Sequence, residues 1–204
     1  MAFDYDAAYR RPGLYWGSAP NDLCLKVVDL VPAAQRVGCR VIDLGCGEGR
    51  DLVHFAREGF RAKGIDRSTA GLAKAAAWAE ADGLRVQVEE ADLVTYRLSE
   101  PYDVVYGSGT LTYLPPRLRA EVFSNYKRWT RPGGLNAFNA FVEKPYLPIP
   151  HDWGDDEYFF RSGELLGYYR DWQILHVDEM EFDCNSGGAP HRHAMAVVIA
   201  RRPG

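Results

Sequence analysis

The stretch RVIDLGCGEGRD at residues 40–51 decides the fold of this chain. Its first part, residues 40–44, is a short apolar run, which is typical of a strand buried on both faces of a parallel sheet. Gly45 ends this run, and an amphipathic pattern from residue 52 to Gly59 predicts a helix. A strand, a glycine-rich loop and a helix in this order predict the nucleotide-binding unit of an open α/β sheet.

The residues on either side repeat the same alternation. Further strands are expected at 60–66, 84–88, 102–106 and 135–142, and helices at 21–31, 68–81 and 115–130. Parallel strands need crossover connections, so the pattern predicts a doubly wound, mostly parallel α/β sheet with helices on both faces. The C-terminal part differs, with a short helix at 163–169 and strands at 172–182 and 193–200. The short turn at 185–188 predicts that these two strands form an antiparallel hairpin.

Composition places the chain among ordinary globular proteins. It has 204 residues, of which 47% are hydrophobic and 25% charged, so one domain over 1–204 is expected and a disordered or coiled-coil chain is excluded. The net charge of −4 gives no general attraction to phosphate backbones, which predicts that nucleic acid is not a partner. No targeting segment or long apolar stretch is visible, which predicts a cytoplasmic protein without a membrane partner.

Two segments stand apart from the regular alternation. Residues 1–20 are rich in aromatic side chains and are expected to form an arm without regular structure. Residues 143–160 form an insertion, also aromatic, at the carboxyl edge of the sheet where ligands bind. Together they are expected to close an aromatic lid over a substrate; the alternative is that they are surface segments anchored by their aromatic side chains.

Carboxylates follow the next two strands. Asp66 lies 21 residues after Gly45, where an acidic side chain accepts hydrogen bonds from the ribose of an adenosine cofactor. Asp92 ends the third strand and is placed to accept from an adenine amine. Arg50 stands where a dinucleotide-binding loop has its third glycine, which disfavours a nicotinamide-dependent oxidoreductase.

The arrangement Asp-x-Gly-x-Gly-x-Gly that begins at Asp43 resembles motif I of the class I S-adenosylmethionine-dependent methyltransferases. The pair Asp92–Leu93, the strand and glycine at 102–107 and the RPGG turn at 131–134 match further motifs of that family. The resemblance implies a Rossmann-like sheet of seven strands in the order 3-2-1-4-5-7-6, with strand 7 antiparallel, and S-adenosylmethionine as cofactor. It also implies cofactor contacts from Asp43, Gly45, Cys46, Gly47, Arg50, Asp66, Arg67, Asp92, Leu93, Gly107 and Ser108.

The segment YFFRSGELLGYYRDW at residues 158–172 and the CGEGRD of residues 46–51 look like the tellurite-resistance (TehB-like) methyltransferases. This resemblance implies methyl transfer to a small-molecule acceptor, above all a soft nucleophile such as tellurite, selenite or a thiol. Two alternatives stay open: an O- or N-methyltransferase of a small metabolite, and a module that binds S-adenosylmethionine without catalysis. The sequence leaves open whether the chain is a monomer or a homodimer.

The catalytic candidates are His191, Arg192 and His193, the densest group of donor and cationic side chains in the chain. Such groups hold an anionic acceptor over the methyl group. The resembling group has His-Arg soon after the strand that ends near Glu181, whereas this chain has Asp183–Cys184 there, so the register of the motif is open. An exposed hairpin end is the alternative explanation for the three residues. Hydroxyls from Thr110, Thr112 and Tyr113 are also expected near the sulfonium.

The spacing of the cysteines and of one group of basic residues carries no functional signal. The four cysteines show no Cys-x-x-Cys spacing and no pairing with histidine, which predicts thiols and no metal site. The spacing of the basic residues around 115–131 is typical of a solvated helix face. This group consists of Arg117, Arg119, Lys127, Arg128 and Arg131.

Overall fold

The computed structural model describes residues 3–151, 153–185 and 188–204. Its strands are β1 (Arg40–Leu44), β2 (Arg61–Asp66), β3 (Val86–Glu90), β4 (Tyr102–Gly107), β5 (Thr130–Val142), β6 (Gln173–Cys184) and β7 (His191–Arg201). Its helices are α1 (Tyr5–Tyr9), α2 (Asp22–Leu30), α3 (Ala33–Arg36), α4 (Arg50–Arg57), α5 (Thr69–Ala81), α6 (Pro116–Trp129) and α7 (Glu164–Gly167), with the 3₁₀ helix η1 (Leu111–Tyr113).

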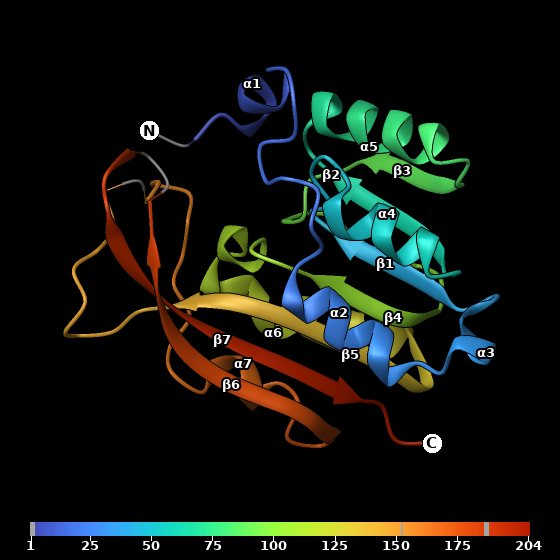
Figure 1. Cartoon of the computed structure of the whole chain (residues 1–204). Coiled ribbons are helices and arrows are strands. Elements are labelled where there is room, and N and C mark those ends of the chain that lie inside the picture. Colours follow the sequence, from blue (N-terminus) through green and yellow to red (C-terminus); the bar gives the residue numbers. More distant parts are fainter. Residues whose placement is uncertain (1–2, 152, 186–187) are drawn as a thin grey trace.

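The described strands form one sheet in the order β3-β2-β1-β4-β5-β7-β6 (Figure 1). The pairs from β3 through β5 are parallel, and β7 runs antiparallel to both β5 and β6. The predicted doubly wound sheet is therefore confirmed, with its strand order, its antiparallel strand 7 and its terminal hairpin. Two residues of the predicted hairpin turn, Ser186 and Gly187, lie outside the described residues.

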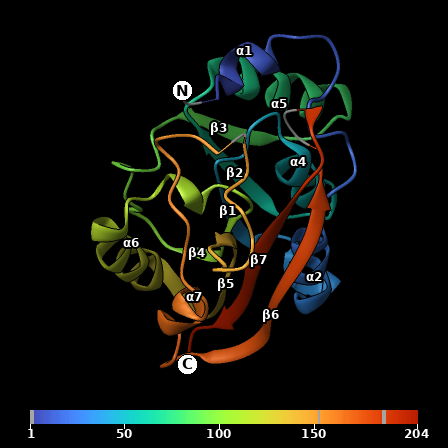
Figure 2. The same cartoon turned by 90° about the vertical axis from the view of Figure 1, so that its left-hand side faces the viewer.

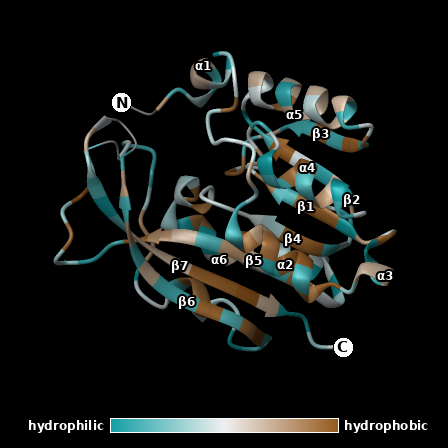
Figure 3. Cartoon of the chain, viewed as in Figure 1, coloured by the Kyte–Doolittle hydropathy of each residue, from teal (hydrophilic) through white to brown (hydrophobic). Residues whose placement is uncertain are grey.

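The central strand β1 is buried on both faces, as its apolar sequence predicted. Successive side chains of a strand point to opposite faces. Val41 packs into the cluster built with α2 and α4, and Ile42 and Leu44 pack into the cluster built with α6. Each of these three side chains is fully buried. Figure 3 shows the matching concentration of hydrophobic residues along the middle of the sheet.

Helices cover both faces of the sheet. Helices α2, α4 and α5 lie on one face, while α6 and α7 lie on the other, and Figure 2 shows α2 and α6 on opposite sides. Side chains cap two of these helices at their N-termini: the Asn21 side chain accepts from the Leu23 N–H, and the Ser68 side chain accepts from the Gly71 N–H. These caps fix where α2 and α5 begin.

The N-terminal arm departs from its prediction, because residues 5–9 form the helix α1. A helix of five residues is not stable by itself, so tertiary contacts hold it. The Asp6 carboxylate accepts from the Ser68 hydroxyl at 2.6 Å and from the Ala70 N–H at 3.0 Å. These bonds lower the pKa of Asp6 to about 2 and dock α1 on the start of α5.

Arg119 also departs from its prediction, because it is not on a solvated face. Its side chain is 1% exposed and lies over the Phe160 ring, 3.6 Å from the centroid. The guanidinium donates to the carbonyl oxygens of Tyr158 and Phe159 and pairs with Glu164 at 3.0 Å. Helical spacing cannot reveal this burial, because the partners lie about 40 residues away in the insertion and α7.

Replacing Arg119 tests this anchor. We expect Arg119→Met to lower the free energy of unfolding by about 3 kcal/mol, because it leaves Glu164 and two carbonyl oxygens without their buried donor. Urea unfolding monitored by tryptophan fluorescence measures the change. Arg117→Met, an exposed position on the same helix, is the matched control. Equal losses in the two variants would contradict the anchoring role.

Candidate functional site

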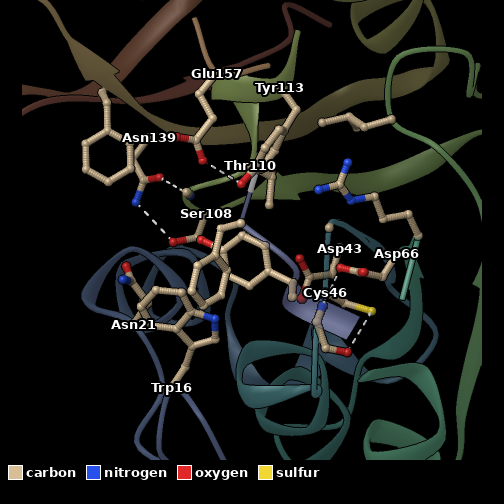
Figure 4. Close-up of a pocket in the computed structure, with 18 of the residues that line it drawn as sticks. Trp16, Asn21, Asp43, Cys46, Asp66, Ser108, Thr110, Tyr113, Asn139 and Glu157 are labelled. Atoms are coloured by element: carbon tan, nitrogen blue, oxygen red, sulfur yellow. Dashed lines mark hydrogen bonds between the residues drawn. The ribbon is translucent and has the colours of Figure 1, made fainter. Parts of the chain in front are cut away.

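A cavity of about 800 Å³ lies at the carboxyl ends of the central strands, where open α/β sheets bind ligands. The loop after β1 and the ends of β2 and β4 form one side of it. The N-terminal arm, the insertion and the β6–β7 hairpin complete the walls. Figure 4 shows the side chains that converge there.

The glycine loop between β1 and α4 is bound to the neighbouring strand. The backbone N–H groups of Gly45 and Cys46 both donate to the Ile65 carbonyl, at 2.8 and 2.9 Å. Gly47 has φ +52°, and a Cβ at this position would lie 2.8 Å from the Tyr9 hydroxyl. The loop therefore needs glycine at position 47 both for its backbone conformation and for the close approach of the arm.

Asp66 sits at the end of β2 and is bonded to the loop. Its carboxylate accepts from the N–H groups of Gly47 and Ser68, each at 2.8 Å. Burial raises the pKa of Asp66, and these backbone bonds oppose the shift. A carboxylate offers about four lone-pair sites, so capacity remains for hydroxyl donors from the cavity.

Two buried acidic residues, Asp43 and Asp51, lie on either side of the glycine loop. Burial raises the pKa of Asp43 well above its usual range, with the Asp51 charge acting in the same direction. Arg50 pairs with Asp51 at 3.1 Å, and Tyr106 donates its hydroxyl to Asp51 at 2.8 Å. The start of α4 is thus held by a polar network that contributes to the cavity wall. Burial also raises the pKa of Cys46, so this residue is a thiol at neutral pH.

The cavity gathers almost all of the predicted cofactor contacts. Gly107 is the exception, since a Cβ there would meet Phe138 and Thr110 at 3.3 Å rather than open space. The others line the cavity wall. They are Asp43, Gly45, Cys46, Gly47, Arg50, Asp66, Arg67, Asp92, Leu93 and Ser108.

The opposite side of the cavity, which we name the C-terminal wall, comes from β5, the insertion and the hairpin. The sequence analysis did not single out its Phe141 and Met195. Alternation along β7 could have found Met195, because it shares a face with His191 and His193. The wall consists of Phe141, Trp153, Tyr158, Phe182, Cys184, His193 and Met195.

Strand alternation divides the three catalytic candidates. His193 is 6% exposed and lines the cavity, and its Nε2 lies 2.9 Å from Nε2 of His191. Arg192 points to the other face, where it pairs with Glu181 at 2.9 Å and stays 53% exposed. The structure therefore brings the two imidazoles together beside the cavity and does not bring Arg192 there.

The structure brings one cysteine next to two histidines, although residue spacing in the sequence shows no such group. Cys184 stands directly across the hairpin from His191. The ligand atoms of Cys184, His191 and His193 all lie within 4.8 Å of one another. Residue spacing missed this group because antiparallel pairing, not local sequence, brings position 184 next to position 191.

The three hydroxyl groups that were expected near the sulfonium do not all lie at the cavity. Thr110 lines the cavity but donates its hydroxyl to the Leu44 carbonyl at 2.8 Å. Tyr113 also lines the cavity and donates to Glu157 at 2.7 Å, while Thr112 is buried outside the lining. Asn139, which sequence analysis missed, accepts from the Gly109 N–H and donates to Ser108, so it fixes the loop after β4 (Figure 4).

The arm and the insertion both form walls of the cavity. Lys74 holds the arm by donating to the carbonyl oxygens of Arg11 and Gly13 and to Glu48. In the insertion, the Trp153 ring stacks on Phe159 with centroids 3.7 Å apart. Both segments therefore have specific contacts and place aromatic side chains at the cavity.

Comparison with known proteins identifies the family. The profile of the family "Tellurite resistance protein TehB" matches residues 21–186. Hemagglutinin 1 of Eikenella corrodens is 25% identical over 169 residues, which cover 81% of this chain and 55% of that protein. The probable S-adenosyl-L-methionine-dependent methyltransferase TehB of Haemophilus influenzae is 27% identical over 152 residues, which cover 74% of this chain and 52% of that protein. This chain thus spans about half the length of these relatives.

The fold comparison agrees with the family profile. The crystal structure of TehB from Haemophilus influenzae superposes with a TM-score of 0.79 at 22% identity, covering 92% of this chain and 64% of that one. Among the described residues, no helix combines the length and the hydropathy that crossing a membrane requires. The sheet order, the glycine loop and the matched profile together show that the chain belongs to the TehB family of tellurite resistance proteins.

Proposed function

We propose that this chain is an S-adenosylmethionine-dependent methyltransferase that acts on a small, soft nucleophile such as tellurite, selenite or a thiol. The observation that carries the proposal is a single cavity that joins the glycine loop and Asp66 to a wall with sulfur and imidazole groups. Membership of the TehB family supports the same reaction. We expect the chain to act in the cytoplasm as a monomer or a homodimer. It is expected to have no nucleic-acid or membrane partner.

The residues beside the loop suit this cofactor. Gly45 and Gly47 have no side chains, so a ligand in the cavity can approach their backbone closely. The first turn of α4 presents N–H groups that suit the carboxylate of the cofactor. Asp66 is proposed to accept from the ribose hydroxyls and Asp92 from the adenine amine. When bound, S-adenosylmethionine supplies an electrophilic methyl group, which an acceptor lone pair takes as the methyl–sulfur bond breaks and its electrons stay on sulfur.

Substitution of Asp66 tests the cofactor site. We expect Asp66→Ala to weaken binding of S-adenosylhomocysteine by about 1–3 kcal/mol, because charged hydrogen bonds to the ribose are lost. Isothermal titration calorimetry measures the affinity, and Asp66→Asn retains an oxygen acceptor for the Gly47 N–H. Asp82→Ala, which removes a surface partner of Arg57, is the control. Unchanged affinity in folded Asp66→Ala would show that the ribose lies elsewhere.

The side chains around the acceptor favour a nucleophile that brings its own lone pair. Burial raises the pKa of Tyr113 and Tyr9, so their hydroxyls stay protonated at neutral pH. Thr110 already donates its hydroxyl to a backbone carbonyl. An oxyanion or a thiolate needs no general base, whereas a neutral hydroxyl does. We propose that His193 orients such an acceptor, and its Nε2 lies 2.9 Å from Nε2 of His191.

An acceptor panel tests the reaction. Protein incubated with S-adenosylmethionine and tellurite, selenite or thiols is expected to form S-adenosylhomocysteine and methylated product, measured by mass spectrometry and headspace analysis. His193→Gln should lower kcat by roughly 100-fold, since one oriented donor is lost. His176→Gln, a half-buried position on β6 away from the cavity lining, is the control.

The other outcomes of this panel contradict the proposal in distinct ways. Turnover confined to hydroxyl or amine acceptors would indicate an O- or N-methyltransferase of a small metabolite. Tight S-adenosylhomocysteine binding without turnover of any acceptor would indicate a binding module without catalysis.

The arm and the insertion are proposed to cover the reacting groups. The rings of Tyr5, from the arm, and Tyr113, beside the insertion, lie edge to face with centroids 6.5 Å apart. Tyr113 in turn donates to Glu157 in the insertion, so a chain of contacts between residues of the cavity lining links the arm to the insertion. Closing such a cover excludes water from the methyl transfer.

Hydrogen exchange tests this cover. We expect amide exchange in residues 3–16 and 153–160 to slow when S-adenosylhomocysteine binds, because ligand contacts stabilise the closed arrangement. Mass spectrometry of proteolytic fragments measures the rates. The exposed helix α3 is the internal control and should not change. Equal rates with and without ligand in both segments would rule out a ligand-dependent cover.

A further inference from the structure

The closed end of the β6–β7 hairpin gathers three side chains with metal-binding chemistry. Cys184 and His191 are direct cross-strand partners, and His193 follows His191 on the same face of β7. Their Sγ and ring nitrogen atoms lie within 4.8 Å of one another. Cys184 and His193 also line the cavity, so the group borders the space proposed for the acceptor.

The orientation of His191 suits a metal ligand. Its Nδ1 lies 2.8 Å from the Ala189 carbonyl oxygen, which accepts only if Nδ1 carries the proton. Nε2 then presents a lone pair toward His193. Metal-binding histidines commonly donate their other ring N–H to a backbone carbonyl in this way. The His151 ring packs edge-on against His191, with centroids 5.0 Å apart, and limits its rotation.

The spacing of the nitrogen atoms fits a shared ion. The two Nε2 atoms are 2.9 Å apart. Two nitrogens that each lie about 2.0–2.1 Å from a tetrahedral Zn²⁺ are separated by about 3.3 Å. A small outward shift of the two rings, with the proton of His193 on Nδ1 so that its Nε2 also presents a lone pair, therefore converts the contact between the imidazoles into joint coordination, with Cys184 as the third ligand.

We propose that Cys184, His191 and His193 form a binding site for a thiophilic divalent metal ion of the Zn²⁺ class. One thiolate and two imidazoles suit Zn²⁺, whereas Mg²⁺ and Ca²⁺ prefer oxygen ligands. Cys184 binds as the thiolate and releases its proton on coordination. Three protein ligands leave a fourth position open, which is the pattern of zinc sites that bind a substrate.

The charge of this site matches the acceptors proposed above. A divalent ion with one thiolate ligand keeps a single positive charge at the C-terminal wall. Arg192 lies on the other face of the hairpin, where it pairs with Glu181 and Asp183. The open position would therefore attract a thiolate or an oxyanion. This second step, in which the ion orients the acceptor, rests on the proposed methyl transfer, whereas the binding of the ion does not.

Cobalt substitution tests the site. The whole chain is treated with a chelator, dialysed and titrated with Co²⁺ while its absorption is recorded. We expect one equivalent to bind with visible bands of a tetrahedral ion and a near-ultraviolet thiolate-to-cobalt charge-transfer band. Cys184→Ser should abolish the charge-transfer band, and His193→Gln should weaken Co²⁺ binding at least about tenfold. Cys39→Ser, a half-buried thiol outside the cavity lining, is the matched control.

The outcomes separate this proposal from the proposed function. Absence of the charge-transfer band in the unaltered chain, or its persistence in Cys184→Ser, overturns the metal site. Calorimetry with S-adenosylhomocysteine on the same chelated samples reports folding and cofactor binding independently of the ion. Methyl transfer to thiols that is restored tenfold or more by added Zn²⁺ supports the orienting role. Transfer at the same rate with and without Zn²⁺ overturns that role and leaves the proposed function standing.

Discussion

The rest of the structure depends on one interaction, the paired hydrogen bonds from Gly45 and Cys46 to the Ile65 carbonyl. They turn the chain out of β1 at a fixed angle, so that α4 begins beside the end of β2. Asp66, the next residue after Ile65, then bonds the Gly47 N–H and closes the same loop. The buried position of β1 makes this turn rigid, since its side chains are packed on both faces of the sheet.

The acceptor side of the cavity follows from strand periodicity. Residues of β7 alternate between two faces, so His193 and Met195 reach the cavity while Arg192 pairs with Glu181 on the outside. Antiparallel pairing with β6 then adds Cys184 to the same group. The antiparallel direction of β7 therefore has a structural consequence. It brings soft donor groups from two strands to the edge where the parallel strands end.

Polar contacts add to aromatic packing in holding the arm and the insertion. Asp6 and Lys74 fix the arm, and Arg119 fixes the end of the insertion through carbonyl groups and Glu164. Hydrogen bonds of this kind are specific in geometry, and each contributes modestly to stability.

The sequence by itself determined the alternating strands and helices and the loop end of the cavity, because hydrophobic periodicity and glycines are local signals. The order of the strands in the sheet came from the resemblance to the class I methyltransferases. The sequence also predicted that Asp66 and Asp92 lie at the same edge of the sheet, because the carboxyl ends of parallel strands meet at one edge. The tertiary structure alone decided the burial of Arg119, the helix α1 and the meeting of Cys184 with His191 and His193. Each depends on contacts between residues distant in sequence or on pairing across strands, which no local pattern encodes.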